Sequence, residues 1–449
     1  MIEKFRNELG IDISSILIPA QGIRPEKWAV VACDQYTSEP LYWEKVKDFT
    51  NGVPSTYHLI FPEVYLEKEN SVEKQNRIEN INNAMCSYID NNYFSEVKNS
   101  MIYIERKTSA GKVRKGLVFA IDLENYDFSK GSQSLIRATE GTIMDRLPPR
   151  IRIRENACLE LPHIMLLIDD RDYGTIENLS KAKDKMKHLY SFSLMMNSGY
   201  LDGYQVNDEE LLTNIFESLR KLKSKKDFSK KYGVGDQLSP LLFAVGDGNH
   251  SLATAKSCWN QLKMTLTDEE KQTHPARFAL IELVNVHDPA LEFEPIHRLL
   301  FNIKASDVLS SFIKHYTDKG LKCGFEYTAG LNSIPENNSS MHVIPFIHNN
   351  KTGYVWVGEP SFTLDVATLQ SFLDNYLKEN SGAELDYVHG ESIVSELGGK
   401  DGNMGFLLSP MDKNDLFKTV IVDGTLPRKT FSMGEADEKR FYMECRSLR

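Results

Sequence analysis

Near its middle the chain reads Leu241-Leu-Phe-Ala-Val-Gly-Asp-Gly-Asn-His-Ser-Leu-Ala-Thr-Ala-Lys256. The five apolar residues 241–245 are enough for a buried strand and too few for a helix of ordinary length. Two glycines then favour a tight turn, because glycine adopts backbone angles that are closed to other residues. Apolar residues recur at helical spacing over 252–262, which predicts a helix beginning near Asn249 or Ser251.

This strand, turn and helix start would create a point that attracts anions. Unpaired backbone N–H groups and the positive end of the helix dipole meet there, and such points bind phosphate or carboxylate groups. The turn differs from a Walker A loop, because the Gly-Lys-Ser/Thr ending is absent, and from a dinucleotide fingerprint, because the third glycine is missing.

Asp247 and His250 give the turn two groups that can take part in chemistry. Histidine titrates near neutral pH, so it can exchange a proton or donate to a phosphoryl oxygen. An aspartate can hold a metal ion or orient the histidine. A structural interpretation fits the pattern equally well, in which Asp247 bonds to the turn amides and His250 caps the helix.

Composition favours an ordinary globular protein. The chain has 449 residues, of which 41% are hydrophobic, and its net charge of −10 argues against a general nucleic-acid binder. The six cysteines lie far apart, which argues against a structural zinc site and against a disulfide framework. With no signal peptide and no apolar run of membrane length, we expect a cytoplasmic protein that acts on a small-molecule substrate rather than on nucleic acid or membrane.

The order of the patterns predicts an α+β fold. Apolar-rich segments on both sides of the loop 108–111 predict a β-hairpin. We expect three portions: an N-terminal αβ portion over 1–130, a central portion with the glycine turn over 131–302, and a C-terminal αβ portion over 303–449. The same pattern is compatible with one elaborated domain, and the oligomeric state stays open.

A second informative stretch runs from Leu135 to Arg146. Its two arginines, a glutamate and a threonine could bind an anion and supply a base. On local sequence alone, a solvated helix start explains this stretch better. Arg24 is held extended by the proline that follows it, and taken alone it is typical of a surface arginine.

Five stretches, in order along the chain, resemble the uncharacterised bacterial and archaeal family called domain of unknown function 1015. They are Pro19-Ala-Gln-Gly-Ile-Arg-Pro25, Arg137-Ala-Thr-Glu-Gly-Thr142, Gly246-Asp-Gly-Asn-His250, Pro295-Ile-His-Arg298 and Leu426-Pro-Arg-Lys-Thr-Phe431. The family usually shows Ala-Asp-Gly-His-His-Arg at the central turn, so Asn249 and Ser251 depart from its pattern. A histidine that the family has between the arginine and the glutamate of the earlier stretch is also missing here.

The family motif is in turn similar to the Asp-Gly-His-His-Arg signature of free-serine kinases in the ParB/sulfiredoxin superfamily. The resemblance implies a mixed-sheet core of that fold, elaborated by a C-terminal αβ portion, and ATP or ADP with Mg²⁺ as cofactor. It implies catalytic roles for Glu140, as the base toward a substrate hydroxyl, and for Asp247 and His250. It also implies a set of residues that would bind nucleotide or phosphate, namely Gly246, Gly248, Asn249, Ser251, Arg137, Thr142, Arg146, Arg24 and Lys429.

The resemblance therefore predicts a small-molecule phosphotransferase. Two alternatives remain open at this point: a nucleotide-responsive regulator, and a non-catalytic interaction protein in which the turn is structural. The regulator would bind nucleotide and transfer little, whereas in the interaction protein His250→Ala and Asp247→Ala would change stability without changing the affinity for any ligand.

Overall fold

The computed structural model describes residues 1–66 and 68–449 of the chain. The protein divides into two compact units, of which the first comprises Met1–Leu291 with Gly434–Arg449 and the second comprises Glu292–Met433. The first unit therefore takes in the expected portion 1–130, most of the expected portion 131–302, and the end of the chain. The second unit begins at Glu292 rather than at residue 303.

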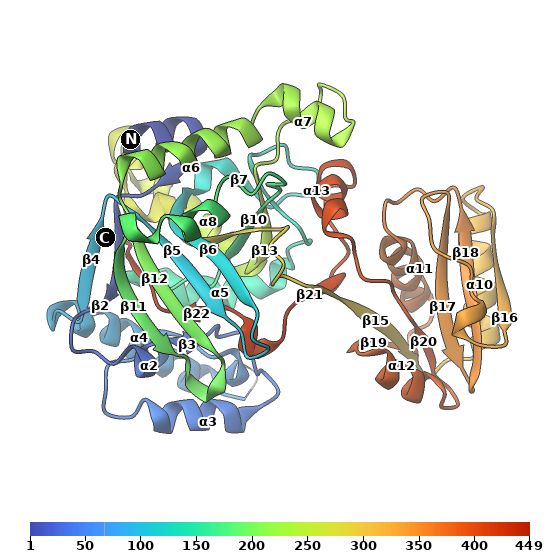
Figure 1. Ribbon diagram of the computed structural model, residues 1–449. Helices are drawn as coiled ribbons and strands as arrows, with labels where there is room; N and C mark the ends of the chain where they lie inside the picture. The colour runs from blue at the N-terminus through green and yellow to red at the C-terminus, as the bar shows by residue number, and fades with distance from the viewer. Residues whose placement is uncertain (67) are drawn as a thin grey trace. The chain divides into compact units, whose positions relative to one another are not determined.

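A large mixed sheet forms the centre of the first unit (Figure 1). Its strands, in spatial order, are β11 (Lys187–Ser193), β12 (Tyr200–Val206), β5 (Met101–Lys107), β6 (Val113–Asp122), β14 (Phe278–Asn285), β10 (Met165–Ile168), β13 (Phe243–Asp247), β8 (Ile136–Ala138) and β7 (Tyr126–Asp127), and β1 (Ile11–Asp12) pairs with β6. β10 runs parallel to β14 and antiparallel to β13, whereas β13 runs parallel to β8. The predicted hairpin is confirmed, because β5 and β6 pair antiparallel.

Two apolar cores cover the two faces of this sheet, because successive strand residues point to opposite sides. Tyr103 and Leu117 belong to one core, and their strand neighbours Ile102 and Val118 belong to the other. The helices of this unit are α1 (Ile2–Lys4), α2 (Pro25–Trp28), α3 (Pro40–Phe49), α4 (Ser71–Asp90), α5 (Leu147–Arg154), α6 (Glu209–Leu222), α7 (Lys225–Tyr232), α8 (Asn249–Leu262) and α9 (Asp268–Thr273). The prediction of a strand followed by a helix is confirmed, with β13 ending at Asp247 and α8 beginning at Asn249.

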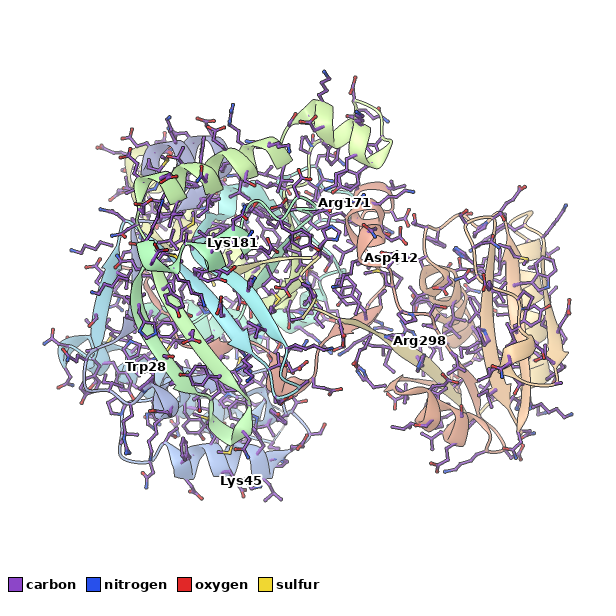
Figure 2. The ribbon with its side chains drawn as sticks, in the orientation of Figure 1. Trp28, Lys45, Arg171, Lys181, Arg298 and Asp412 are labelled. Carbon is purple, nitrogen blue, oxygen red and sulfur yellow. The ribbon has the colours of Figure 1, made fainter. Side chains whose placement is uncertain are left out.

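Two small antiparallel pairings build the end of the chain into the first unit, and a third joins two segments of its N-terminal part. β2 (Ser15–Pro19) pairs with β4 (Phe94–Lys98), β3 (Val30–Val31) with β22 (Phe441–Tyr442), and β9 (Leu159–Glu160) with β23 (Arg446–Ser447). Trp28, labelled in Figure 2, donates its Nε1 hydrogen bond to the carbonyl of Met443 at 3.0 Å. We call Gly434–Arg449 the C-terminal segment.

The second unit contains an antiparallel sheet with its own helices. Its strands are β16 (Cys323–Thr328), β18 (Lys351–Gly358), β17 (Met341–His348), β20 (Met404–Phe406), β15 (Phe293–Phe301) and β19 (Glu384–His389) in spatial order, with β21 (Phe431–Met433) paired to β15. Its helices are α10 (Ala305–Thr317), α11 (Asp365–Glu379), α12 (Glu391–Gly398) and α13 (Lys413–Val422). The α+β class predicted from the sequence is thus confirmed in both units.

Over the described ranges 1–66 and 68–449, no helix combines the length and the apolar character that crossing a bilayer requires.

Candidate functional site

The turn between β13 and α8 has the geometry that its glycines predict. Gly248 has a φ of +78°, and a Cβ atom added there would lie 3.0 Å from the Cα of Ile164, so the position is suited to glycine. The amide of Gly248 donates to Asp247 Oδ1 at 2.9 Å. No side chain in the described part of the chain caps α8, so the N–H groups of its first turn and the positive end of its dipole are available to an anion.

The loop that follows β8 lies beside this helix start. Asn249 Nδ2 donates to Thr139 Oγ1 at 3.4 Å, and the amide of Ile143 donates to His250 Nε2 at 3.3 Å. The two informative stretches of the sequence, about a hundred residues apart, therefore meet in one place. Thr142 Oγ1 and Asn249 Oδ1 are buried in this place without a hydrogen-bond partner among the described residues.

His250 is a neutral imidazole at this site. Burial first, and then the nearby charges of Arg150 and Arg146, lower its pKa to about 4, although the carboxylate of Asp34 acts in the opposite direction. Because its Nε2 accepts the hydrogen bond from Ile143, the ring proton resides on Nδ1. At neutral pH His250 can therefore donate one hydrogen bond or accept a proton, but it carries no charge of its own.

Sequence reasoning missed a second histidine, His163, which lies next to Ser251. His163 Nε2 lies 3.2 Å from Ser251 Oγ and 3.4 Å from Asp34 Oδ2, and its Nδ1 lies 2.6 Å from the hydroxyl of Tyr442. Burial disfavours charge on this histidine, but the carboxylate of Asp34 outweighs burial and raises the pKa of His163. The sequence indicates this pair only weakly. Asp34 and His163 each adjoin an apolar run, which predicts that both lie at strand ends.

A lysine of the C-terminal segment also reaches the turn. Lys439 Nζ lies 3.3 Å from Asp247 Oδ2, and both residues belong to the first unit. Lys429, for which the resemblance implies such a role, belongs to the second unit, where its carbonyl accepts a hydrogen bond from Arg298 Nη1 at 3.1 Å. Lys439 is thus a contact of the turn that the sequence did not predict.

The other residues predicted from sequence are spread around the unit. Arg137 is buried, and it donates to the carbonyls of Ser134 and Ser239, near the end of β13 opposite to Asp247. Arg24 is exposed at the start of α2, and Arg146 is exposed in the loop beside His250. Glu140 is half-buried and directly follows Thr139, which contacts Asn249.

A cavity of about 140 Å³ opens beside the first turn of α8. Ser251 and His163 line one part of it, and the ion pair between Arg150 and Glu63 lines another. The remaining wall is largely apolar, with Phe61 among its residues. A cavity of about 150 Å³ holds a molecule the size of benzene, so this one suits a small metabolite with an apolar portion.

Comparison with known proteins identifies a family and distant structural likenesses. The family described as a protein of unknown function, DUF1015, matches residues 17–376. Among solved structures, a mutant free serine kinase in complex with AMP has 9% identity and a TM-score of 0.38, covering 74% of this chain and 91% of its own. A conserved hypothetical protein from Pyrococcus furiosus has 10% identity and a TM-score of 0.36, covering 75% of this chain and 97% of its own. TM-scores this low do not establish a shared fold, and no curated protein matches the chain.

Proposed function

The chain belongs to the DUF1015 family of proteins of unknown function, and we propose that the turn before α8 binds the phosphates of ATP or ADP. In this proposal the protein is a small-molecule phosphotransferase of the free-serine-kinase type, with a core of the ParB/sulfiredoxin kind. The proposal is carried by one observation, the uncapped first turn of α8 with the buried, unpartnered Thr142 hydroxyl beside it.

The groups around the turn suit a bound phosphate. The helix amides and the Thr142 hydroxyl are donors, and Arg146 and Arg150 add positive charge close to His250. The arginine that the family pattern has at position 251 is serine here, and Arg150 of α5 supports the proposal because it supplies a guanidinium from another element. Neutral His250 keeps a proton on Nδ1 that can be donated to a phosphoryl oxygen.

The site also suits a Mg²⁺ ion that arrives with the nucleotide. No group of three His, Cys, Asp or Glu side chains within residues 1–66 and 68–449 is arranged to hold a metal, and Mg²⁺ commonly binds through one or two carboxylates and the substrate phosphates. Asp247 would supply the carboxylate, and the buried Asn249 Oδ1 would accept from a water ligand. Bound there, Mg²⁺ would neutralise phosphate charge.

The chain's own residues would then orient the acceptor molecule. In our proposal the acceptor occupies the cavity beside Ser251, and His163 holds the Ser251 hydroxyl in a fixed orientation. Glu140 is proposed as the base that removes the proton of the acceptor hydroxyl, and Lys439 as the cation that limits charge repulsion between Asp247 and the phosphates.

Calorimetric titration of the full chain with ADP and ATP, with and without Mg²⁺, tests nucleotide binding. Thr142→Val should weaken binding about tenfold or more, because it removes a hydrogen bond to a charged group and keeps the side-chain shape. Thr213→Val on α6, which removes a hydroxyl that donates to the carbonyl of Glu209, is the matched control and should leave affinity unchanged. No binding heat at millimolar nucleotide would rule the proposal out.

A transfer assay separates the phosphotransferase from the nucleotide-responsive regulator. The protein is incubated with ATP or ADP, Mg²⁺ and free amino acids or other small hydroxyl compounds, and phosphorus NMR follows new phosphate esters. Ester formation that requires both substrates supports the phosphotransferase. Nucleotide binding with slow hydrolysis, insensitive to added metabolites, would favour the regulator.

A further inference from the structure

Two cysteines of the first unit, Cys86 and Cys158, lie in contact although 72 residues separate them along the chain. Their Sγ atoms are 3.6 Å apart, and both thiols are free. Cys86 belongs to α4, and Cys158 directly precedes β9. The spacing of the cysteines in the sequence does not indicate this pair, because only the fold brings α4 against the start of β9.

The surrounding contacts keep the two thiols near each other. Cys158 belongs to one of the two apolar cores of the first unit, and Cys86 packs against the same core. The carbonyl of Cys158 also accepts a hydrogen bond from the amide of Leu448 at 3.0 Å. A disulfide requires that two sulfurs approach to about 2.05 Å, so these two would have to move together by about 1.5 Å. Side-chain rotation with a small shift of α4 supplies a movement of this size.

The two thiols differ in their access to solvent. Cys86 is half-buried, whereas Cys158 is only 2% exposed. A groove of about 580 Å³ follows the same two segments, and Asn83 and Asn156, close in sequence to the two cysteines, are among its lining residues. A reagent from solvent therefore reaches Cys86 more readily. Burial and the neighbouring Cys86 raise the pKa of Cys158 to about 11, which keeps Cys158 a thiol in the reduced protein.

We propose that Cys86 and Cys158 form a reversible disulfide when the protein meets a low-molecular-weight disulfide such as glutathione disulfide. The thiolate of Cys86 attacks one sulfur of the reagent, a mixed disulfide forms, and one glutathione thiolate leaves. The sulfur of Cys158 then attacks the sulfur of Cys86, the protein disulfide forms, and the second glutathione thiolate leaves. The two protons lost by the cysteines end on the two glutathione thiols, and the reagent gains the two electrons that the cysteine sulfurs lose.

This disulfide would act on the cavity beside Ser251. Met85, Ala157 and Leu159 adjoin the two cysteines in sequence, and all three line that cavity. Drawing the two sulfurs together moves α4 toward β9 and changes this part of the cavity wall. Thiol oxidation is thereby coupled to the shape of the cavity. The disulfide does not depend on the proposed nucleotide function, because it requires only the packing of α4 against the start of β9.

Peptide mapping of the wild-type full chain tests whether the disulfide forms. The folded protein is incubated with glutathione disulfide, its remaining thiols are blocked with N-ethylmaleimide, and it is digested without reductant. Mass spectrometry should detect the Cys86 peptide linked to the Cys158 peptide, and dithiothreitol should separate them. Recovery of Cys86 only as a mixed disulfide with glutathione, or unmodified, would overturn the proposal.

Thermal unfolding measures the effect of the crosslink on stability. Oxidation should raise the Tm by about 3–6 °C, because a crosslink between distant residues restricts the unfolded chain. Cys86→Ser and Cys158→Ser should each abolish both the linked peptide and this rise. Cys258→Ser removes another half-buried thiol of the first unit, on α8, and should retain both. A rise that persists in Cys158→Ser would contradict the assignment of the partner.

The methyl group of Met85 reports on the cavity wall. Its carbon-13 methyl signal in NMR, assigned with Met85→Leu, should shift when the wild type is oxidised and return when dithiothreitol is added. In Cys158→Ser the signal should not undergo this shift. A crosslinked protein with an unchanged Met85 signal would overturn the coupling of the disulfide to the cavity.

Discussion

At the scale of single residues, the main feature is the pair formed by the half-buried Asp34 and the buried His163 beside Ser251. Neither residue stands in a recognisable motif, and they are far apart in the chain, so only the fold brings their side chains within 3.4 Å. The carboxylate of Asp34 favours the imidazolium form and so raises the pKa of His163, against the opposing effect of burial. His250, on the other side of the same helix turn, is held neutral by burial and by two arginines.

Asp34→Asn should lower the pKa of His163, because the carboxylate that raises it is removed. Histidine ring signals followed by NMR over a pH series measure the change, and the exposed His188 provides an internal control. An unchanged His163 titration would show that Asp34 does not govern this histidine.

The same pair gives the wild type a characteristic pH dependence of stability. The pKa of Asp34 is lowered in the folded protein, so its contribution is present above the unfolded-state pKa of aspartate and is lost on acidification. The pKa of His163 is raised, so its contribution is present below the unfolded-state pKa of histidine and is lost as pH rises through the folded value. Both contributions are present together at about pH 5–6.

At the scale of elements, the order of strand, turn and helix could be predicted from the sequence, whereas the residues around the turn could be predicted only in part. Local periodicity predicted that α8 begins near Asn249 or Ser251, and it begins at Asn249, because this signal lies within a short window. The family resemblance, and not a local pattern, predicted that the loop after β8 would lie near the start of α8. Lys439 and Tyr442 were missed because long-range pairing of β22 with β3 brings them in, and local pattern contains no information on such pairing.

The buried carboxylate of Glu160 joins β9 to β23. Removing its arginine partners one at a time measures how much this contact contributes to the free energy of unfolding. Glu160 accepts from Arg446 at 2.8 Å and from Arg154 at 2.5 Å, and Arg446 is the more buried of the two arginines. We expect Arg446→Met to lower the free energy of unfolding by about 3 kcal/mol, as loss of a buried partner does.

Arg154→Met is the matched comparison, since it removes the second partner of the same carboxylate. Its arginine is closer to solvent and Glu160 keeps Arg446, so we expect a loss of about 1 kcal/mol. Urea unfolding of the two variants measures both values. Equal losses of unfolding free energy, or a larger loss for Arg154→Met, would contradict the assignment of Arg446 as the more important partner of Glu160.

At the scale of the whole molecule, the second unit is an insertion into the first. The first unit is interrupted after Leu291 and resumes at Gly434. Phe293 and Met433 are paired residues of β15 and β21, so the two crossing points of the chain lie side by side. The order of the sequence patterns predicts a boundary near residue 303, but no local pattern reveals that a chain returns to an earlier unit.

Excision of residues 292–433 and connection of Leu291 to Gly434 by a short Gly-Ser linker should give a folded first unit. The expectation follows from the paired ends, which a few residues can bridge. Circular dichroism and cooperative urea unfolding measure folding. Residues 1–291 without the C-terminal segment are the control and should unfold at lower urea, because they lack β22 and β23.

The insertion also sets the order in which the site can be assembled during synthesis on the ribosome. Most of the turn, the helix and the cavity wall emerge early, but Lys439 and Tyr442 follow only after the whole inserted unit has been translated, a delay on the order of ten seconds. A nascent chain that stalls inside the insertion carries an incomplete pocket. Translation of the C-terminal segment thus supplies the contacts of Lys439 with Asp247 and of Tyr442 with His163, and it follows translation of the whole inserted unit.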